Sequence, residues 1–289
     1  MPRLPRSGIA LGATLVMLAA ACTAVNAVVV RVVTQTGVDP LEVAFFRNLF
    51  GLLLVMPWLA REGARALVGA RLPLHVARAV ANLASMVTFF YALAHMQVAD
   101  VVALNFTAPL FASVGAVLFF GERMRARRTT ATVVGFAGAL LILRPSFETV
   151  GAIAVLPLIA AASWAAMTLL GKRLAERESA SAIVAFNLVL MVPVSALPAI
   201  AVWTTPSPTA LALMLLHGVL GTVNQFLMVR ALLLADAGAL MPFDYVRLPF
   251  VALLGFVLFA EVPDAWTWAG GAVVFAAGAY IAHRERRAG

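Results

Sequence analysis

The sequence predicts an all-α integral membrane protein, with ten transmembrane helices arranged as two inverted five-helix repeats around a central cavity. Hydrophobic residues make up 63% of the 289-residue chain and charged residues only 12%. A water-soluble domain could not bury that much apolar surface. Apolar runs of roughly 20 residues, each long enough to cross a bilayer, recur along the chain. The chain also contains an internal duplication, which predicts the two repeats.

The duplication is clearest between residues 91–122 and residues 230–261. Each segment has a polar turn, an apolar run broken by a proline, and a glutamate at its end. The two glutamates, Glu122 and Glu261, match at an offset of 139 positions. We expect both to be structural terminators of their spans.

Glycine, proline and charged clusters divide the apolar sequence into ten predicted spans. They lie near residues 8–30, 41–60, 73–95, 99–120, 128–144, 150–171, 180–202, 209–232, 237–259 and 265–283. The first repeat covers residues 1–146 and the second covers residues 147–289. Because each repeat has an odd number of spans, the second enters the membrane from the opposite face. Inverted repeats that meet at a midplane site are typical of secondary transporters.

Lysine and arginine placement predicts the orientation, because these residues gather on the cytoplasmic side. With a cytoplasmic N-terminus, 16 of the 21 basic residues fall in inside segments. Only Arg31 and Arg144 fall outside, and Arg47, Arg78 and Arg247 lie within spans. We therefore expect both termini on the cytoplasmic side of a bacterial-type inner membrane.

The net charge of +8 comes from short basic clusters between apolar runs, so it indicates topology and not a nucleic-acid surface. The expected partners are the lipid bilayer and a small-molecule substrate, with the chain as a monomer or weak homodimer. The sequence has no ATP-binding P-loop, no zinc-binding H-E-x-x-H and no nucleophile elbow. A single cysteine, Cys22, excludes an internal disulfide. We expect no cofactor, no metal and no enzymatic activity.

Two polar stripes lie at equivalent positions of the two repeats. The third span carries Arg78, Asn82, Ser85 and Phe89 on one helical face, and the eighth carries His217, Gly221, Asn224 and Met228 at the same spacing, with Gln225 adjacent. Ionisable groups at membrane depth normally face a bundle interior, so we expect the stripes to face each other across a cavity and bind substrate. In the alternative, Asn82, Ser85 and Asn224 only make interhelical hydrogen bonds.

The ninth span contains Asp244, Tyr245 and Arg247. Asp244 and Arg247 are three residues apart and could neutralise each other. In the alternative, Arg247 or Arg78 grips a substrate carboxylate at two points, and Asp244 receives an amine or a proton. His217 could couple transport to protons or could be a fixed hydrogen-bonding residue.

Further candidates lie in the first, second and sixth spans. Asn26 and Trp164 occupy corresponding parts of the two halves. Trp164 and Phe89 could form a stacking wall for the substrate, or could be lipid-facing or packing groups. Arg47, which matches Asn187 in the second half, is expected to snorkel or to bond backbone carbonyls.

Two proline and two aspartate positions carry expectations about helix ends. Pro109 and Pro249 lie inside predicted spans, where each could open a kink beside a cavity or be a tolerated kink without a role. Asp100 and Asp236 precede predicted helices and are expected to be N-caps.

Several short motifs resemble the EamA-type repeats of the drug/metabolite transporter superfamily. They are FRNLFG at 46–51, ADVVALNFTAP at 99–109, FFGER at 119–123, VGFAGALLILRP at 134–145, PFDYVRLP at 242–249 and FAEVP at 259–263. The resemblance covers nearly the whole chain and implies ten helices in two inverted repeats. It also implies a cavity lined mainly by spans one, three, four, six, eight and nine.

Members of this superfamily export amino acids or related metabolites, and others take up S-adenosylmethionine or riboflavin. The resemblance therefore implies a secondary transporter that exports amino acids or related small metabolites by alternating access. The alternative is an uptake carrier for S-adenosylmethionine, riboflavin or another nucleoside-like or vitamin metabolite. Two other classes stay open: an intramembrane enzyme using Asp244 and His217 as acid and base, and a scaffold.

Overall fold

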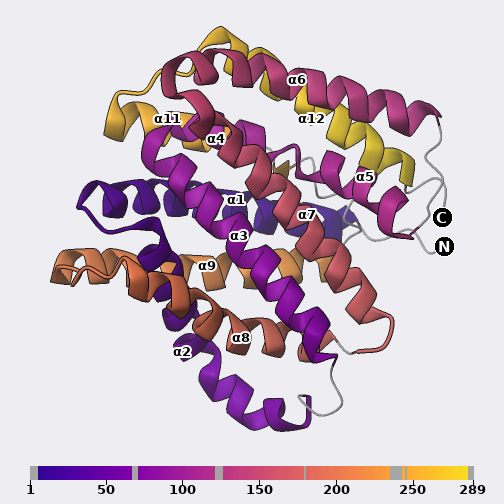
Figure 1. Cartoon of the computed structure of the whole chain (residues 1–289). Coiled ribbons are helices and arrows are strands. Elements are labelled where there is room, and N and C mark those ends of the chain that lie inside the picture. The colour runs from indigo at the N-terminus through magenta and orange to yellow at the C-terminus, as the bar shows by residue number, and fades with distance from the viewer. Residues whose placement is uncertain are drawn as a thin grey trace.

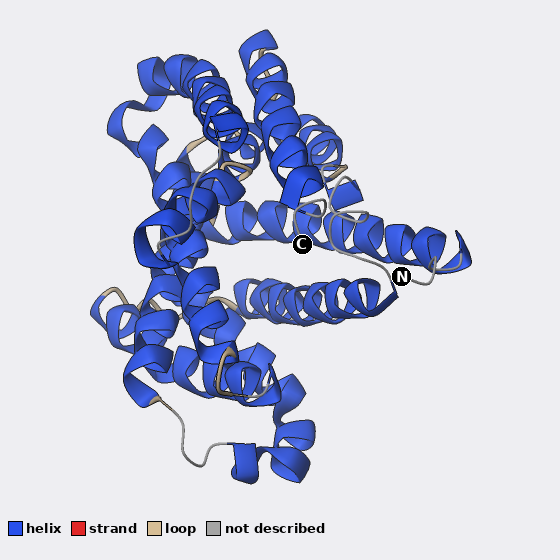
Figure 2. Ribbon diagram, turned by 90° about the vertical axis from the view of Figure 1, so that its right-hand side faces the viewer, coloured by secondary structure: helices blue, strands red, loops and turns tan. Residues whose placement is uncertain are grey.

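The computed structural model describes residues 6–66, 71–120, 126–178, 180–234, 243–244 and 246–285, and these residues form helices and short loops without a strand (Figures 1 and 2). The helices are α1 (Arg6–Gln35), α2 (Pro40–Ala66), α3 (Leu72–His95), α4 (Val98–Asn105), α5 (Ala108–Phe120), α6 (Ala126–Val150), η1 (Gly151–Val155), α7 (Leu156–Ala175), α8 (Ala180–Ala201), α9 (Pro208–Leu234), α11 (Arg247–Phe259) and α12 (Ala265–Glu285).

These elements follow the ten predicted spans in order, with α4 and α5 together forming the fourth and η1 and α7 together forming the sixth. Five of the described spans are long and apolar enough to cross a membrane on length and composition alone. Shorter apolar helices include α11 and part of α12. The predicted all-α membrane fold is therefore confirmed.

The fourth span differs from the prediction of one continuous helix. The chain leaves the helix after Asn105 and re-enters it at Ala108, so the span is broken and not merely kinked. Pro109 is the second residue of α5 and Pro249 is the third residue of α11. A proline in the first turn of a helix loses no backbone hydrogen bond, which explains why both prolines lie at helix starts.

Asp100 does not cap its helix as expected. The N-cap of α4 is Gln97, and Asp100 lies in the first turn, where its carboxylate accepts a hydrogen bond from the Thr267 hydroxyl at 2.5 Å. The sequence pattern placed the helix start too late. Asp236, Glu122 and Tyr245 lie outside the described residues.

Contacts between equivalent helices show that the two repeats run in opposite directions. α2 and α8 are the second helices of the two repeats. Glu42, near the start of α2, accepts a hydrogen bond from Thr204, which follows the end of α8. Further along, Asn48 donates to Ser195 at 3.2 Å. The two helices are therefore antiparallel.

The last helices of the repeats, α6 and α12, are antiparallel as well. A Cβ added at Gly138 would lie 2.7 Å from Val273, and one added at Gly135 would lie 3.0 Å from Ala277. At Gly270 an added Cβ would come within 2.5 Å of the Gly138 carbonyl oxygen. The helices approach this closely because glycines face each other, as is common for helices packed within a bilayer.

The two repeats also exchange partners. α1 packs against α9, and its equivalent in the second repeat, α7, packs against α3. Figure 1 shows α1 and α9 side by side, with α3 crossing in front of them. The polar residues of helices α1–α3 therefore contact those of helices α7–α9.

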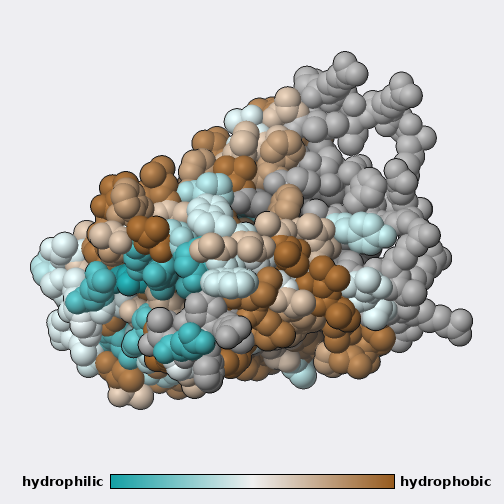
Figure 3. All heavy atoms as spheres, turned by 90° about the horizontal axis from the view of Figure 1, so that it is seen from above, coloured by the Kyte–Doolittle hydropathy of each residue, from teal (hydrophilic) through white to brown (hydrophobic). Residues whose placement is uncertain are grey.

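Apolar side chains cover the sides of the bundle, and hydrophilic ones gather at one end. Leu118, Phe119 and Leu197 are each 75% exposed, as expected of side chains that face lipid. Seen from above, hydrophilic atoms concentrate at the left-hand end in Figure 3, which is also the left-hand end of Figure 1. This distribution suits a protein whose sides contact hydrocarbon and whose ends contact water.

Candidate functional site

The first of two polar clusters lies between α1, α2 and α9, and we call Asn26, Arg47 and His217 the Arg47 cluster. The Asn26 amide lies 2.8 Å from Nδ1 of His217. The Arg47 guanidinium donates to the Asn48 amide oxygen at 3.4 Å. His217 is buried, and the Phe90 ring packs edge-on against it at 5.4 Å between centroids.

Arg47 points into the bundle across α9. A Cβ added at Gly221 would lie 3.3–3.6 Å from three atoms of its guanidinium, so a glycine at this position makes room for the charge. The expectation that Arg47 snorkels or bonds carbonyls is therefore wrong. The sequence contains one hint of this position of Arg47 against α9. Arg47 matches Asn187 in the second repeat, so both were candidates for the same polar layer.

The second cluster lies between α3, α7 and α8, and we call Arg78, Asn82 and Asn187 the Arg78 cluster. The Asn187 amide oxygen accepts hydrogen bonds from the Arg78 guanidinium at 2.8 Å and from the Asn82 amide at 3.3 Å. Arg78 also lies across a glycine, because a Cβ added at Gly171 would be 3.3 Å from its Nε.

The two clusters are equivalent under the duplication. His217 follows Arg78 by 139 positions, and Asn187 follows Arg47 by 140. Each cluster therefore has one arginine, but on a different helix of its repeat. Asn187 lies eight residues before Ser195, which contacts Asn48 beside Arg47, so the clusters are separated by roughly 12 Å along the bundle.

Each cluster holds a buried polar atom without a hydrogen-bond partner among the described residues. These atoms are Nε of Arg78 and Nε2 of His217, at equivalent positions of the two repeats. The described residues also provide no carboxylate partner within ion-pair distance for Arg47 or Arg78. Even a partly buried guanidinium costs free energy when it has no counter-charge, and hydrogen-bond acceptors on a ligand would satisfy both clusters.

The described polar residues of each predicted stripe bond to helices of the opposite repeat. Arg78 is bonded to α8 and His217 to α1, because each repeat packs its third helix on the opposite repeat. Ser85 donates to the Ala160 carbonyl at 2.8 Å. The Asn224 amide donates to the Thr23 hydroxyl at 2.8 Å. These two residues make interhelical hydrogen bonds.

In the ninth span, Asp244 and Arg247 form an ion pair with 3.7 Å between Oδ2 and Nη2. The Arg247 guanidinium also lies over the Phe106 ring, 4.5 Å from its centroid. The geometry therefore favours mutual neutralisation of Asp244 and Arg247. Tyr245 and the side chain of Gln225 lie outside the described residues.

The two predicted aromatic residues lie apart from the clusters. Phe89 packs against the main hydrophobic core, and Trp164 on α7 is 44% exposed. Phe90, the neighbour of Phe89, contacts the Arg47 cluster instead. The sequence offered no signal for this choice, because both phenylalanines fit a helical core pattern.

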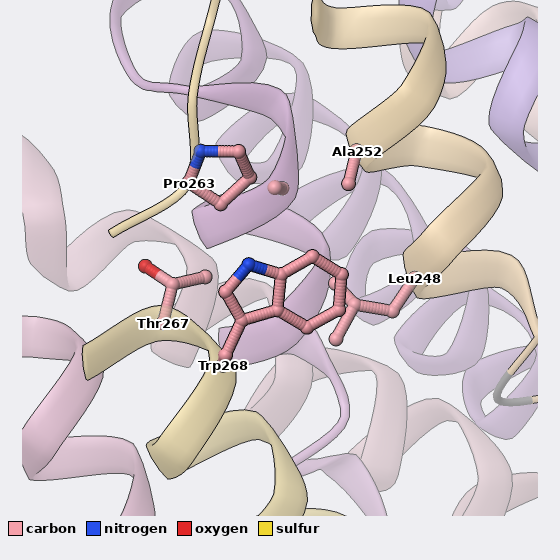
Figure 4. A pocket seen from close by; sticks show the side chains of 6 residues that line it. Leu248, Ala252, Pro263, Thr267 and Trp268 are labelled. Atoms are coloured by element: carbon pink, nitrogen blue, oxygen red, sulfur yellow. The ribbon is translucent and has the colours of Figure 1, made fainter. Parts of the chain in front are cut away.

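A shallow, largely apolar hollow lies between α4, α11 and α12. Figure 4 shows Trp268 and Leu248 at its wall. None of the predicted site residues lines it. The two polar clusters, and not this hollow, are the candidate substrate site.

Comparison with known proteins finds one family that matches each repeat separately. The profile of the EamA-like transporter family matches residues 10–144 and again residues 151–282. The chain belongs to the EamA-like transporter family. This confirms the resemblance found in the sequence, and membership makes the chain a multi-pass membrane protein with two repeats that carries small molecules.

Two relatives and one solved structure illustrate this EamA-like protein's similarities. It is 33% identical to the riboflavin transporter of Brucella anthropi, over 93% of this chain and 98% of that one. It is 29% identical to the S-adenosylmethionine uptake transporter of Rickettsia bellii, over 88% of this chain and 86% of that one. A crystal structure with 17% identity superposes at a TM-score of 0.62 over 98% of this chain and 99% of that one, so the two share a fold.

Proposed function

We propose that this protein is a secondary transporter that takes up riboflavin, or an uncharged heterocycle of similar polarity, by alternating access. The substrate would bind between the Arg47 cluster and the Arg78 cluster. The observation that carries the proposal is the pair of partly buried arginines without a described carboxylate partner. In addition, Nε of Arg78 and Nε2 of His217 lack a hydrogen bond.

The charge of the clusters separates the candidate substrates. Asn26, Asn82 and Asn187 offer amide groups, and Arg47 and Arg78 offer donors only. S-Adenosylmethionine carries a sulfonium and an ammonium group, which two partly buried arginines would repel. Riboflavin offers ring carbonyls, ring nitrogens and hydroxyl groups, which accept hydrogen bonds from guanidinium and amide groups. Its planar ring also suits an edge-on phenylalanine such as Phe90.

Export of amino acids has less support from the site. An amino acid needs a receptor for its carboxylate, which Arg47 or Arg78 could provide, and one for its ammonium group. Asp244 was the predicted receptor, and it is ion-paired with Arg247. The relative with 33% identity is named a riboflavin transporter and a second relative is named an uptake transporter, which supports uptake of a heterocycle. We further propose that both termini are cytoplasmic, as the basic residues predict.

The experiment is counterflow in proteoliposomes. Vesicles loaded with unlabelled riboflavin should accumulate labelled riboflavin from outside, and excess S-adenosylmethionine or phenylalanine should not compete. Arg78→Gln or Arg47→Gln should lower the rate roughly ten-fold or more, because a hydrogen bond to a charged group contributes about 1.5–3 kcal/mol. The matched control is Ser85→Ala, which removes a polar group from the same face of α3 but outside the cluster.

Exchange of phenylalanine or S-adenosylmethionine without exchange of riboflavin would contradict the proposal. Equal losses in Ser85→Ala and Arg78→Gln would also contradict it, because they would show that the face matters only for packing. Chemical change of the solute inside the vesicles would favour the intramembrane enzyme.

A further inference from the structure

The end of the bundle that holds Glu261 ties the two repeats together through polar contacts. We call this end the Glu261 face, and its tied residues are Arg31, Glu42, Met96, Val98, Asp100, Thr204, Glu261 and Thr267. Most of its contacts described below join a residue of the first repeat to one of the second; the exceptions are Arg31 with Met96, Tyr91 with Asp39, and Thr267 with Asp264. In a transporter with inverted repeats, such contacts must break before this face can open.

Arg31 and Glu261 lie at the centre of these contacts. Their side chains form an ion pair with 2.7 Å between Nη1 and Oε1, and they are only 16% and 10% exposed. The second carboxylate oxygen of Glu261 accepts a hydrogen bond from the Val98 backbone N–H at 2.9 Å. Arg31 also donates to the Met96 carbonyl, and its guanidinium lies over the Phe259 ring, 4.9 Å from the centroid.

The pair therefore connects four chain segments at once. Met96 is the C-cap of α3 and Val98 is the first residue of α4, so the pair bonds both sides of the turn between these helices. Phe259 and Glu261 mark the end of α11, and Arg31 comes from α1. Releasing the pair would free the α3–α4 turn from the end of α11.

Two further contacts flank the pair. Glu42 is fully buried and accepts hydrogen bonds from the backbone and hydroxyl of Thr204. Asp100 accepts a hydrogen bond from the Thr267 hydroxyl, and the Thr267 backbone N–H donates to Asp264 at 2.7 Å. At the opposite end, the described residues include a contact between the repeats at His75 and Glu178.

We propose that Arg31 and Glu261 form a latch that holds the Glu261 face closed, and that each transport cycle breaks and remakes this ion pair. The proposal rests on transport by alternating access, but its test needs no substrate. Burial acts to raise the pKa of Glu261 above its usual range, and the nearby Asp100 carboxylate also raises it, while the Val98 N–H and Arg31 act to lower it.

The test measures access to a single cysteine in the Arg47 cluster. Cys22→Ala removes the only native cysteine, and Asn26→Cys places a reporter five residues before Arg31, roughly 7.5 Å deeper along α1. A membrane-impermeant maleimide is applied to each side of oriented vesicles. Arg31→Gln together with Glu261→Gln removes the latch and leaves no unpaired buried charge.

The double variant should label at least roughly five-fold faster from the Glu261 face, and more slowly from the opposite face, because a two-state transporter opens one face at the expense of the other. The matched control is Tyr91→Phe. It removes hydrogen bonds of 2.8 and 3.0 Å to Asp39, which lies on the same face but in the same repeat as Tyr91. Labelling in this control should stay at the rate of the parent.

Three outcomes would overturn the latch. They are an unchanged labelling rate in the double variant, an equal increase in Tyr91→Phe, and an increase from both faces, which would mean that the pair only stabilises the fold. A clear shift in labelling, combined with no riboflavin exchange by the wild-type protein that retains Asn26, would keep the latch and reject riboflavin as the substrate. Riboflavin exchange with unshifted labelling would reject the latch alone.

Discussion

The Arg47 cluster and the Arg78 cluster occupy equivalent places in the inverted repeats, yet each carries its arginine on a different helix. In the first, the charge comes from the second helix of its repeat and faces His217 on α9. In the second, the charge comes from the third helix and contacts Asn187 on α8. The duplication has kept one guanidinium among neutral partners at each depth, whichever helix provides it. Under the proposed function, substrate binding would depend on the charge and its depth more than on the helix that carries it.

Moving the guanidinium from Arg78 to position 187 tests this comparison between the clusters. It should give the largest changes in the rate of riboflavin exchange. Arg78→Asn alone should lower riboflavin exchange by roughly ten-fold or more, because it removes a charged hydrogen bond. Arg78→Asn combined with Asn187→Arg places the charge on the second helix, as in the Arg47 cluster. Exchange by the double variant should recover to within about three-fold of wild type, which an effect on folding alone would not explain.

Gly221 and Gly171 make room for Arg47 and Arg78. Replacing either glycine with alanine should affect transport less than the arginine substitutions do, and the two replacements should differ in size. Gly221→Ala brings a Cβ within 3.6 Å of three guanidinium atoms of Arg47, whereas Gly171→Ala meets one atom of Arg78. We expect KM for riboflavin to rise roughly three-fold for Gly221→Ala and less for Gly171→Ala, each arginine moving by a few tenths of an ångström. Alanine is favoured over glycine in a helix by about 1 kcal/mol, so Tm should not fall. A fall in Tm with unchanged KM would contradict this role.

Ser85 and Asn224 also occupy equivalent positions, one turn from the clusters, and both make interhelical bonds. Ser85→Ala and Asn224→Ala should each lower the free energy of unfolding by about 1 kcal/mol, the usual net contribution of such a hydrogen bond. Riboflavin exchange per folded molecule should change less than two-fold. The measurement pairs thermal unfolding in detergent with counterflow, and a selective loss of exchange would extend the site to this turn.

The smallest effect concerns the contact at the end opposite the Glu261 face. Burial acts to raise the pKa of Glu178, but hydrogen bonds from the Arg71 N–H and the His75 ring outweigh it and lower the pKa. A lowered carboxyl pKa adds stability above the unfolded pKa of about 4.3, and this stability is lost as pH falls through the folded pKa. Wild type should therefore exceed Glu178→Gln in Tm by a few degrees at neutral pH. The difference should shrink below about pH 4, and a difference that grew in acid would contradict the assignment.

The sequence predicted the architecture well because its signals are repeated and local. Apolar run lengths and the offset of about 140 positions give the number of helices and their inversion. The break at residues 106–107 was missed because an apolar sequence with a proline also fits a kinked span. The partners of the polar stripes were missed because the repeats exchange helices, and no single-helix pattern records that Arg78 contacts Asn187 on α8.

Binding of riboflavin to the purified protein tests the central claim most directly. Flavin fluorescence is titrated with wild type and with the double variant Arg47→Gln/Arg78→Gln, using Ser85→Ala as the control for folding. We predict saturable binding by wild type and by Ser85→Ala, and a loss of roughly 100-fold or more in affinity for the double variant, since two charged hydrogen-bonding groups are removed. Equal affinity of wild type and the double variant would contradict the claim that the two arginine clusters bind the substrate.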